Sequence, residues 1–416
     1  MKKNIFFYLV YLESVVILIY RVLFFYLEVF MQLDSRKFGY KFDKGKFEFY
    51  CCKEEYPDLL DSESVYVTGT FNGWLNTGDS DWLMAKRTEK GKTVFVLEKS
   101  LENIMVPGNS GYPEFKFFGL SENSCHILSE KLDSPNVFLG NKLILLNSYE
   151  IEDAENLKKR TGSFKEMEDF DLDCPACRSE ISNFRRAPGT KALFRGYHPY
   201  KKSRGWMDTE NERINLVRKG IELYGIKSDI TLCGYEAVSS LAEETPCELV
   251  DDMERKNNRL CVNIDYNLVY FHPDAAEYLS ALQKISRFML EHPGPFYIHC
   301  RLGSDRTGVT VAIFAALCGA GWKEIAEDYE KTSCCGIGEF RNRRLLQYSL
   351  KKLTGYDPAD SKNLAHLVQS LFIKENILKA AEIEALIKKL NTEPRKKETD
   401  FFDFSGHHIC ARKSAN

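Results

Sequence analysis

One short segment constrains the fold of this chain more than any other. Residues 297–308 read YIHCRLGSDRTG and lie between the apolar run PFYIHC and the apolar helical run GVTVAIFAALCG. A loop that leaves a strand and enters a helix points successive backbone N–H groups inward, where they and the helix dipole bind an anion such as phosphate. Gly303 permits the tight turn. The segment therefore predicts an α/β domain with an anion site at residues 300–308.

The side chains of this loop suit phosphoryl transfer. Cys300 lies at the base of the predicted cradle, where a positive potential favours the nucleophilic thiolate. Arg306 has a planar guanidinium that matches two phosphate oxygens and the charge of a transition state, and the hydroxyl of Thr307 is placed to assist the departing thiolate. The residues expected to bind the phosphate are Arg301, Leu302, Gly303, Ser304, Asp305 and Arg306.

This segment resembles the C-x5-R signature of cysteine-dependent protein tyrosine and dual-specificity phosphatases, with the preceding histidine and the following Thr-Gly. The likeness extends over about residues 183–355, because NFRRAPGTKALFRGYHP and DYEKTSCCGIGEFRNRR resemble segments of bacterial tyrosine phosphatase-like proteins. The resemblance implies an α/β domain with a central, mostly parallel sheet flanked by helices. It also implies hydrolysis of phosphate monoesters through a phosphocysteine, with no metal or other cofactor.

Such a reaction needs a general acid that protonates the leaving oxygen. The tripeptide His272-Pro273-Asp274 resembles the W-P-D loop of the family, which makes Asp274 the first choice. Asp274 with Glu277 also fits a capping box for the helix EYLSALQKISRFML. Asp265, at the end of the predicted strand RLCVNI, and Asp305, inside the loop, are the alternatives.

Cysteine usage bears on the compartment and on regulation. The chain has 13 cysteines in 416 residues without a regular disulfide framework, which favours reduced thiols and a cytoplasmic location. Cys233 ends the predicted strand SDITLC, and related lipid and glucan phosphatases carry a cysteine at a similar place that pairs with the nucleophile; a core thiol is the alternative. A zinc site built from Cys174, Cys177 and the distant HHIC at 407–410 is a weaker hypothesis.

The strand-rich part of the chain, residues 37–148, predicts an all-β, immunoglobulin-like sandwich. Its VYVTGTFNGW and FKF elements resemble those of glycogen- and starch-binding modules. The resemblance implies glycan contacts from Trp74, whose ring offers a flat apolar face, and from Lys116, a hydrogen-bond donor. Core packing is the alternative for Trp74, and is favoured for Trp82.

Six segments are expected along the chain. They are an apolar lead over 1–33, the sandwich over 37–148, an acidic, solvated linker over 149–173, the phosphatase domain over 174–355, packing helices over 356–391 and a flexible tail over 392–416. The lead fits a membrane-associated helix over residues 4–33, although Glu13, Arg21 and Glu28 interrupt it. Packing against the rest of the protein, or initiation at Met31, would explain it equally.

The substrate is less constrained than the reaction. A net charge of -3 argues against nucleic acid as a partner. A phosphorylated protein, on tyrosine or with dual specificity, is the first expectation. The order of the two modules is similar to that of laforin-like glucan phosphatases, but Leu302 and Asp305 depart from their usual C-x-A-G-x-G-R loop. A phosphorylated glycan of glycogen or starch type, a phosphoinositide, or non-catalytic binding of phosphorylated or glycan partners are the alternatives.

Overall fold

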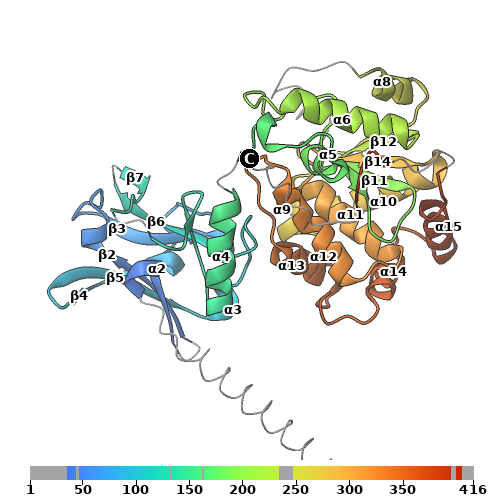
Figure 1. The fold of residues 1–416 in the computed structure, drawn as a ribbon. Helices are drawn as coiled ribbons and strands as arrows, with labels where there is room; N and C mark the ends of the chain where they lie inside the picture. Colours follow the sequence, from blue (N-terminus) through green and yellow to red (C-terminus); the bar gives the residue numbers. More distant parts are fainter. Residues whose placement is uncertain are drawn as a thin grey trace, which may run out of the picture. The chain divides into compact units, whose positions relative to one another are not determined.

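The computed structural model describes residues 35–43, 46–122, 124–131, 134–161, 164–233, 247–394 and 400–404. The chain divides into two compact units, residues 1–108 with 112–158, and residues 109–111 with 159–416 (Figure 1). The apolar lead over 1–33 lies outside the described residues. Within the described residues, no helix combines the length and the apolar character that a membrane span requires.

The first unit contains two antiparallel sheets. One has the order β1-β2-β5-β4, formed by Tyr40–Asp43, Lys46–Cys52, Lys92–Lys99 and Ala85–Glu89. The other has the order β3-β6-β9-β8, formed by Ser64–Gly69, Glu114–Ser121, Asn141–Leu143 and Val137–Phe138, with β7 (Ser124–Ile127) paired to β6. The short helices of this unit are α2 (Ser35–Phe38), η1 (Lys53–Glu55), η2 (Thr70–Asn72), η3 (Ser80–Trp82) and α3 (Leu101–Ile104).

Aromatic side chains form the core between these sheets. Phe47 and Phe49 alternate with the half-buried Glu48 along β2, as expected for a strand with one buried face. The Phe49 ring meets the ring of Phe115 on β6 with centroids 5.1 Å apart, which joins the two sheets. The all-β character expected for this segment is therefore present.

The expected acidic linker begins instead with a long helix, α4 (Ser148–Thr161). Ala154 and Leu157 lie three residues apart on one face and are each 1% exposed, whereas Glu152 and Glu155 are exposed. The boundary between the units falls inside this helix, after Lys158. Further along, η4 (Met167–Asp169) precedes the buried Phe170.

The second unit is built on a sheet of order β10-β11-β14-β12-β13 (Figure 1). Its strands are Arg185–Arg186, Leu193–Gly196, Phe296–His299, Ser228–Thr231 and Arg259–Cys261. Only the β10–β11 pair is antiparallel. The central strand β14 is buried along its whole length, which explains its continuous apolar sequence. The mostly parallel sheet expected for this domain is confirmed.

Helices surround this sheet. They are α5 (Pro175–Ser182), α6 (Glu210–Leu223), α8 (Glu248–Arg255), α9 (Tyr266–Phe271), α10 (Ala276–Glu291), α11 (Asp305–Leu317), α12 (Trp322–Lys331), η5 (Thr332–Cys334), α13 (Arg343–Thr354), α14 (Leu364–Lys374) and α15 (Ala380–Leu390). Helix α11 is buried from Thr307 to its end, as its apolar sequence on all sides requires. Residues of α14 and α15 belong to the same apolar core.

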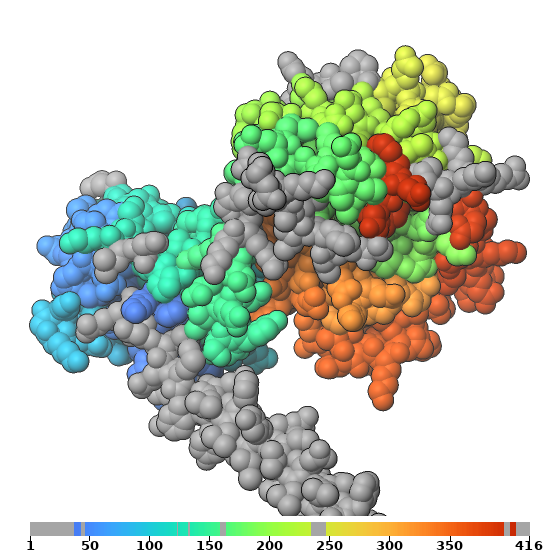
Figure 2. Space-filling model, viewed as in Figure 1, coloured from blue at the N-terminus to red at the C-terminus, as the bar shows by residue number. Residues whose placement is uncertain are grey.

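Part of the expected flexible tail packs against the second unit. Phe402 is 5% exposed, and its ring lies 5.1 Å from that of Phe184. The side chain of Arg178 on α5 donates to the carbonyl of Phe401 at 2.7 Å. Residues 400–404, red in Figure 2, lie against the green surface of α5. A short apolar segment is therefore enough to hold this part of the tail against the second unit.

Candidate active site

The loop at residues 300–304 lies where the sequence predicts it, between β14 and α11. Cys300 is 2% exposed at the start of the loop. Gly303 has a φ of +73°, and a Cβ atom there would lie 2.2 Å from the carbonyl oxygen of Gly196. Both the left-handed backbone and the close approach of β11 require glycine at this position.

Three side chains hold the loop from outside. The carbonyls of residues 301, 302 and 303 accept, in that order, from Ser203 Oγ at 3.1 Å, Asn183 Nδ2 at 3.1 Å and the Arg195 guanidinium at 2.7 Å. A planar trans peptide directs its N–H opposite to its C=O. Because these carbonyls are bound on the outside, the N–H groups that follow them face the interior of the loop. No local sequence pattern marked these three residues as supports of the loop.

Arg195 is itself held in a buried ion pair. Its guanidinium lies 2.6 Å from the carboxylate of Asp328, which also pairs with Arg185 at 2.5 Å. Burial lowers the pKa of Arg195 to about 10, so the residue stays charged at neutral pH. Although burial opposes ionisation of Asp328, the two arginines hold the pKa of its carboxyl below the usual value. Arg195 thus connects the loop to α12.

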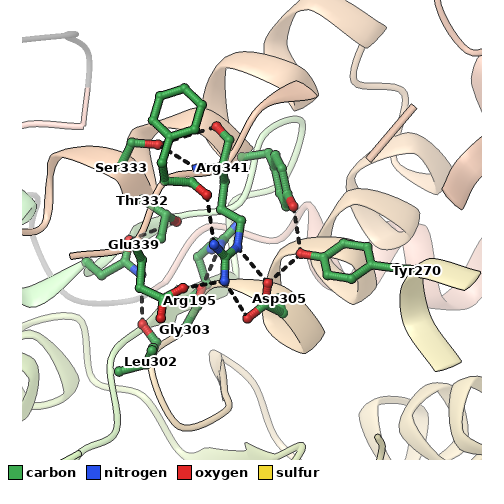
Figure 3. A network of polar contacts seen from close by, with 12 residues as sticks. Arg195, Tyr270, Leu302, Gly303, Asp305, Thr332, Ser333, Glu339 and Arg341 are labelled. Carbon is green, nitrogen blue, oxygen red and sulfur yellow. Dashed lines mark hydrogen bonds and ion pairs between the residues drawn. The ribbon is translucent and has the colours of Figure 1, made fainter. Parts of the chain in front are cut away.

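The Asp305 carboxylate is bound by the side chains of Arg341 and Tyr270. It accepts from Arg341 at 2.6 and 2.9 Å and from the hydroxyl of Tyr270 at 2.6 Å (Figure 3). Burial opposes ionisation, but the adjacent Arg341 lowers the pKa of this carboxyl. An ionised carboxylate at the start of α11 also interacts favourably with the helix dipole. Asp305 therefore anchors the helix and is poorly suited as the general acid or as a side-chain ligand of phosphate.

Donors without partners surround the loop. Among the described residues, the buried Ser304 Oγ, Thr307 Oγ1 and Arg306 Nε have no hydrogen-bond partner. Buried polar atoms are nearly always paired in folded proteins, so this group indicates a place for ligand oxygens. The guanidinium of Arg306 also donates to the carbonyl of Ile264 at 3.2 Å. The Leu302 side chain, in contrast, belongs to an apolar cluster.

The two remaining acid candidates lie at opposite ends of α9. Asp265 is exposed at its N-terminus, where it accepts from the N–H of Asn267 at 2.7 Å. It directly follows Ile264, whose carbonyl binds Arg306. Asp274 comes after the C-terminal end, and a helix of this length spans about 9 Å. Asp265 is thus adjacent in the chain to the residue whose carbonyl binds Arg306, whereas Asp274 follows the far end of α9.

The capping box expected at Asp274 does not form. Helix α10 begins at Ala276, and its N-cap is Ala275, without a side-chain hydrogen bond. Asp274 is exposed near α13, where burial and the charge of Asp274 together raise the pKa of Tyr348. The sequence pattern would make Asp274 the N-cap, but the N-cap of α10 is Ala275, one residue later.

His299, at the end of β14, is fixed from both sides. Its Nε2 lies 3.1 Å from Asp229 on β12, and its Nδ1 lies 3.2 Å from the carbonyl of Cys300. Asp229 also lies 3.4 Å from Arg259 on β13. This row of side chains lies beside the peptide that carries the nucleophile, and no sequence pattern marked Asp229 as part of it.

A family model matches the part of the chain that contains the loop. Residues 231–382 match the model of the tyrosine phosphatase family. No curated protein matches the chain. Among solved structures, the chain is similar to the core catalytic domain of the PP-IP phosphatase SIW14 from S. cerevisiae in complex with citrate, with 18% identity and a TM-score of 0.26, over 47% of this chain and 94% of that chain. The family match and the loop together support a cysteine phosphatase domain in the second unit.

Cys233 is a buried, free thiol near the loop that begins at Cys300. Its sulfur is 3.3 Å from the hydroxyl of Thr231. Burial raises the pKa of this thiol, and the charge of Cys300 also contributes. The two cysteines are thus close enough to interact electrostatically, and a disulfide between them stays a prediction.

The zinc hypothesis gains no support. Cys177 is disulfide-bonded and so is not available as a thiolate ligand, whereas Cys174 is free. The residues at 407–410 lie outside the described part of the chain. Among the residues that are described, no group of three or more His, Cys, Asp or Glu side chains is arranged to hold a metal ion.

The residues expected to bind glycan lie near one end of the β3–β6 pair. Trp74 is 38% exposed, and its backbone N–H donates to the carbonyl of Gly69 at 2.9 Å. The neighbouring Thr68 lies opposite Lys116 in the strand register. Trp82 stacks on Phe71 with ring centroids 4.7 Å apart, which is the packing role expected for it.

Proposed function

We propose that the second unit is a cysteine-dependent phosphatase that hydrolyses phosphate monoesters through a phosphocysteine. The observation that carries this proposal is the loop above Cys300, whose carbonyls at residues 301–303 are bound from outside. The inward N–H groups, with the unpartnered donors of Ser304 and Arg306, suit the three oxygens of a phosphoryl group. The family match over residues 231–382 supports the same reaction.

In the first step, the thiolate of Cys300 attacks phosphorus. The S–P bond forms while the P–O bond to the leaving group breaks, and the leaving oxygen takes the proton of Asp265. The loop N–H groups and the guanidinium of Arg306 stabilise the charge on the equatorial oxygens. We assign the acid to Asp265 because it directly follows Ile264, the residue whose carbonyl binds Arg306.

In the second step, water attacks the phosphocysteine. The S–P bond breaks, one proton of the water passes to the carboxylate of Asp265, and inorganic phosphate leaves. The departing thiolate of Cys300 accepts a hydrogen bond from the hydroxyl of Thr307, which is free to donate because it has no other partner among the described residues. The enzyme returns to its starting state without a change in oxidation.

The substrate that we propose first is a phosphorylated protein, on tyrosine or with dual specificity. Trp206 and Phe164 support it, because they are 65% and 42% exposed and their rings meet edge to face at 4.8 Å. This pair lies near Ser203, which exchanges hydrogen bonds with Arg301 of the loop. An exposed aromatic pair beside a phosphate site suits the ring of a phosphotyrosine.

Hydrolysis of a small aryl phosphate tests the reaction. We expect turnover by the wild-type chain, and Cys300→Ser to reduce kcat by about 10³-fold or more, as for loss of other nucleophiles. Cys318→Ser is the matched control, because Cys318 is a free, half-buried thiol beyond the end of α11. Activity retained in Cys300→Ser would overturn the proposal. Trp206→Ala should raise KM for a phosphotyrosyl peptide far more than for the small aryl phosphate.

We also propose that the first unit binds glycan through Trp74 and Lys116. Two observations support this role: Trp74 is partly exposed, and Lys116 pairs with Thr68, next to the Gly69 carbonyl that binds the backbone N–H of Trp74. Co-sedimentation with glycogen, and phosphate release from phosphorylated amylopectin, test it directly. Trp74→Ala should abolish binding, whereas the control Leu75→Ala, at a 45% exposed residue in the same turn, should not. Binding that survives Trp74→Ala would exclude this proposal.

A further inference from the structure

Basic side chains lie on the segment that follows β11. Because β11 runs parallel to β14 with Gly196 opposite His299, residues 197–201 leave the sheet at the edge that carries the catalytic loop. Lys201 in this segment is only 4% exposed, and its Nζ has no hydrogen-bond partner among the described residues. Lysine is almost never buried in this way unless it is paired.

A second donor without a partner lies nearby. His198 is 1% exposed, and its Nδ1 accepts from the backbone N–H of Tyr200 at 3.4 Å. This bond assigns the proton of the neutral ring to Nε2, which has no acceptor in the described part of the chain. The ring packs edge to face against His299, with centroids 4.6 Å apart, one residue before the nucleophile.

The surroundings of these two groups are positive. Burial holds the pKa of His198 well below its usual value, and the charges of His299, Arg259, Lys201 and Arg306 act in the same direction. In the described part of the chain, the nearby acidic group Asp229 is already paired with His299 and Arg259. A buried cation without a counter-ion is strongly unfavourable, so this cluster needs an anion from outside the described residues.

We propose that the Lys201 ammonium and the His198 Nε2–H form a second anion subsite beside the catalytic loop. It binds a second phosphoryl group of the substrate while the first lies over Cys300. This inference rests on the proposed phosphatase function and extends its substrate class to compounds with two neighbouring phosphates. A singly phosphorylated tyrosine, or free orthophosphate, occupies only the loop.

Calorimetry on Cys300→Ser tests the subsite without turnover. Inorganic phosphate and inorganic pyrophosphate are the two probes, since only pyrophosphate reaches both positions. In this background we expect pyrophosphate to bind about tenfold or more tightly than phosphate, the gain of one charge-assisted contact. Adding Lys201→Met should bring the two affinities to within about threefold. Lys201→Arg should keep most of the preference, and Lys323→Met, at an exposed lysine of α12, should keep all of it.

Thermal unfolding gives a second, independent readout. Without any anion, Lys201→Met should raise Tm, because it removes a buried charge that has no partner. Pyrophosphate should then stabilise this variant less than its parent. Equal affinities for the two probes in the Cys300→Ser parent would overturn the proposal without a further mutation, and so would a preference that survives Lys201→Met. Failure of the phosphatase proposal is distinguishable, because it would appear as aryl phosphate hydrolysis unaffected by Cys300→Ser.

Discussion

Replacing Gly303 with alanine tests the geometry of the loop most sharply. The left-handed φ of +73° costs an alanine about 1–2 kcal/mol. The added Cβ would also lie 2.2 Å from the carbonyl oxygen of Gly196, which cannot retreat because β11 is hydrogen-bonded to β14. Overpacking of this kind costs about 1–3 kcal/mol. The free energy of unfolding should therefore fall by about 2–5 kcal/mol.

The chain offers a matched control for this change. Gly355 has a similar φ of +80°, but in the described part of the chain nothing lies within 4 Å of the position of its Cβ. Gly355→Ala should therefore lose only the backbone cost of about 1–2 kcal/mol and keep full activity. Urea unfolding and kcat/KM on an aryl phosphate measure both effects. If Gly303→Ala matched Gly355→Ala in stability and stayed active, the close packing of loop and β11 would be refuted.

Three further results are expected. Asp265→Asn should reduce kcat on an alkyl phosphate by about 10²-fold or more and remove the limb of the pH profile due to the acid, whereas Asp274→Asn should leave both unchanged; the reverse outcome would reinstate Asp274. The folded-state pKa of Asp328 is lowered, so its pairing stabilises the fold above the unfolded value of about 4, and this stability is lost as the pH falls through the folded value. Asp328→Asn should therefore flatten the dependence of unfolding free energy on pH below about 4, and an unchanged slope would contradict the assignment. Phe402→Ala should lower unfolding free energy by about 3 kcal/mol, and a change near zero in urea unfolding would show that the tail does not pack.

The nucleophile and its loop were predictable because their signal is local. One contiguous segment carries the strand, Cys300, the glycine, Arg306 and the helix, so spacing alone places them together. Asn183 and Arg195 support the same loop from more than a hundred residues away in sequence. The segment that contains them stood out only because it resembles bacterial tyrosine phosphatase-like proteins. Nothing in the two residues themselves indicated a hydrogen bond to a loop carbonyl.

The remaining differences arise where tertiary packing overrides a local pattern. The capping pattern at Asp274 is real in the sequence, but α10 starts one residue too late to use it. The many acids of residues 149–173 conceal the apolar face of α4, on which Ala154 and Leu157 are buried. Nothing in the sequence around Asp305 indicates that it pairs with Arg341, because Arg341 lies on a separate segment of the chain.

The phosphocysteine intermediate can be detected directly. A reaction with an excess of aryl phosphate, stopped within its first turnovers by denaturant, should yield one phosphorylated peptide in mass spectrometry. We expect this peptide to contain Cys300 with the phosphoryl group on its sulfur, and we expect Asp265→Asn not to prevent its formation from a substrate with a good leaving group. Turnover without any phosphopeptide, or with the phosphoryl group on another residue, would rule out Cys300 as the nucleophile.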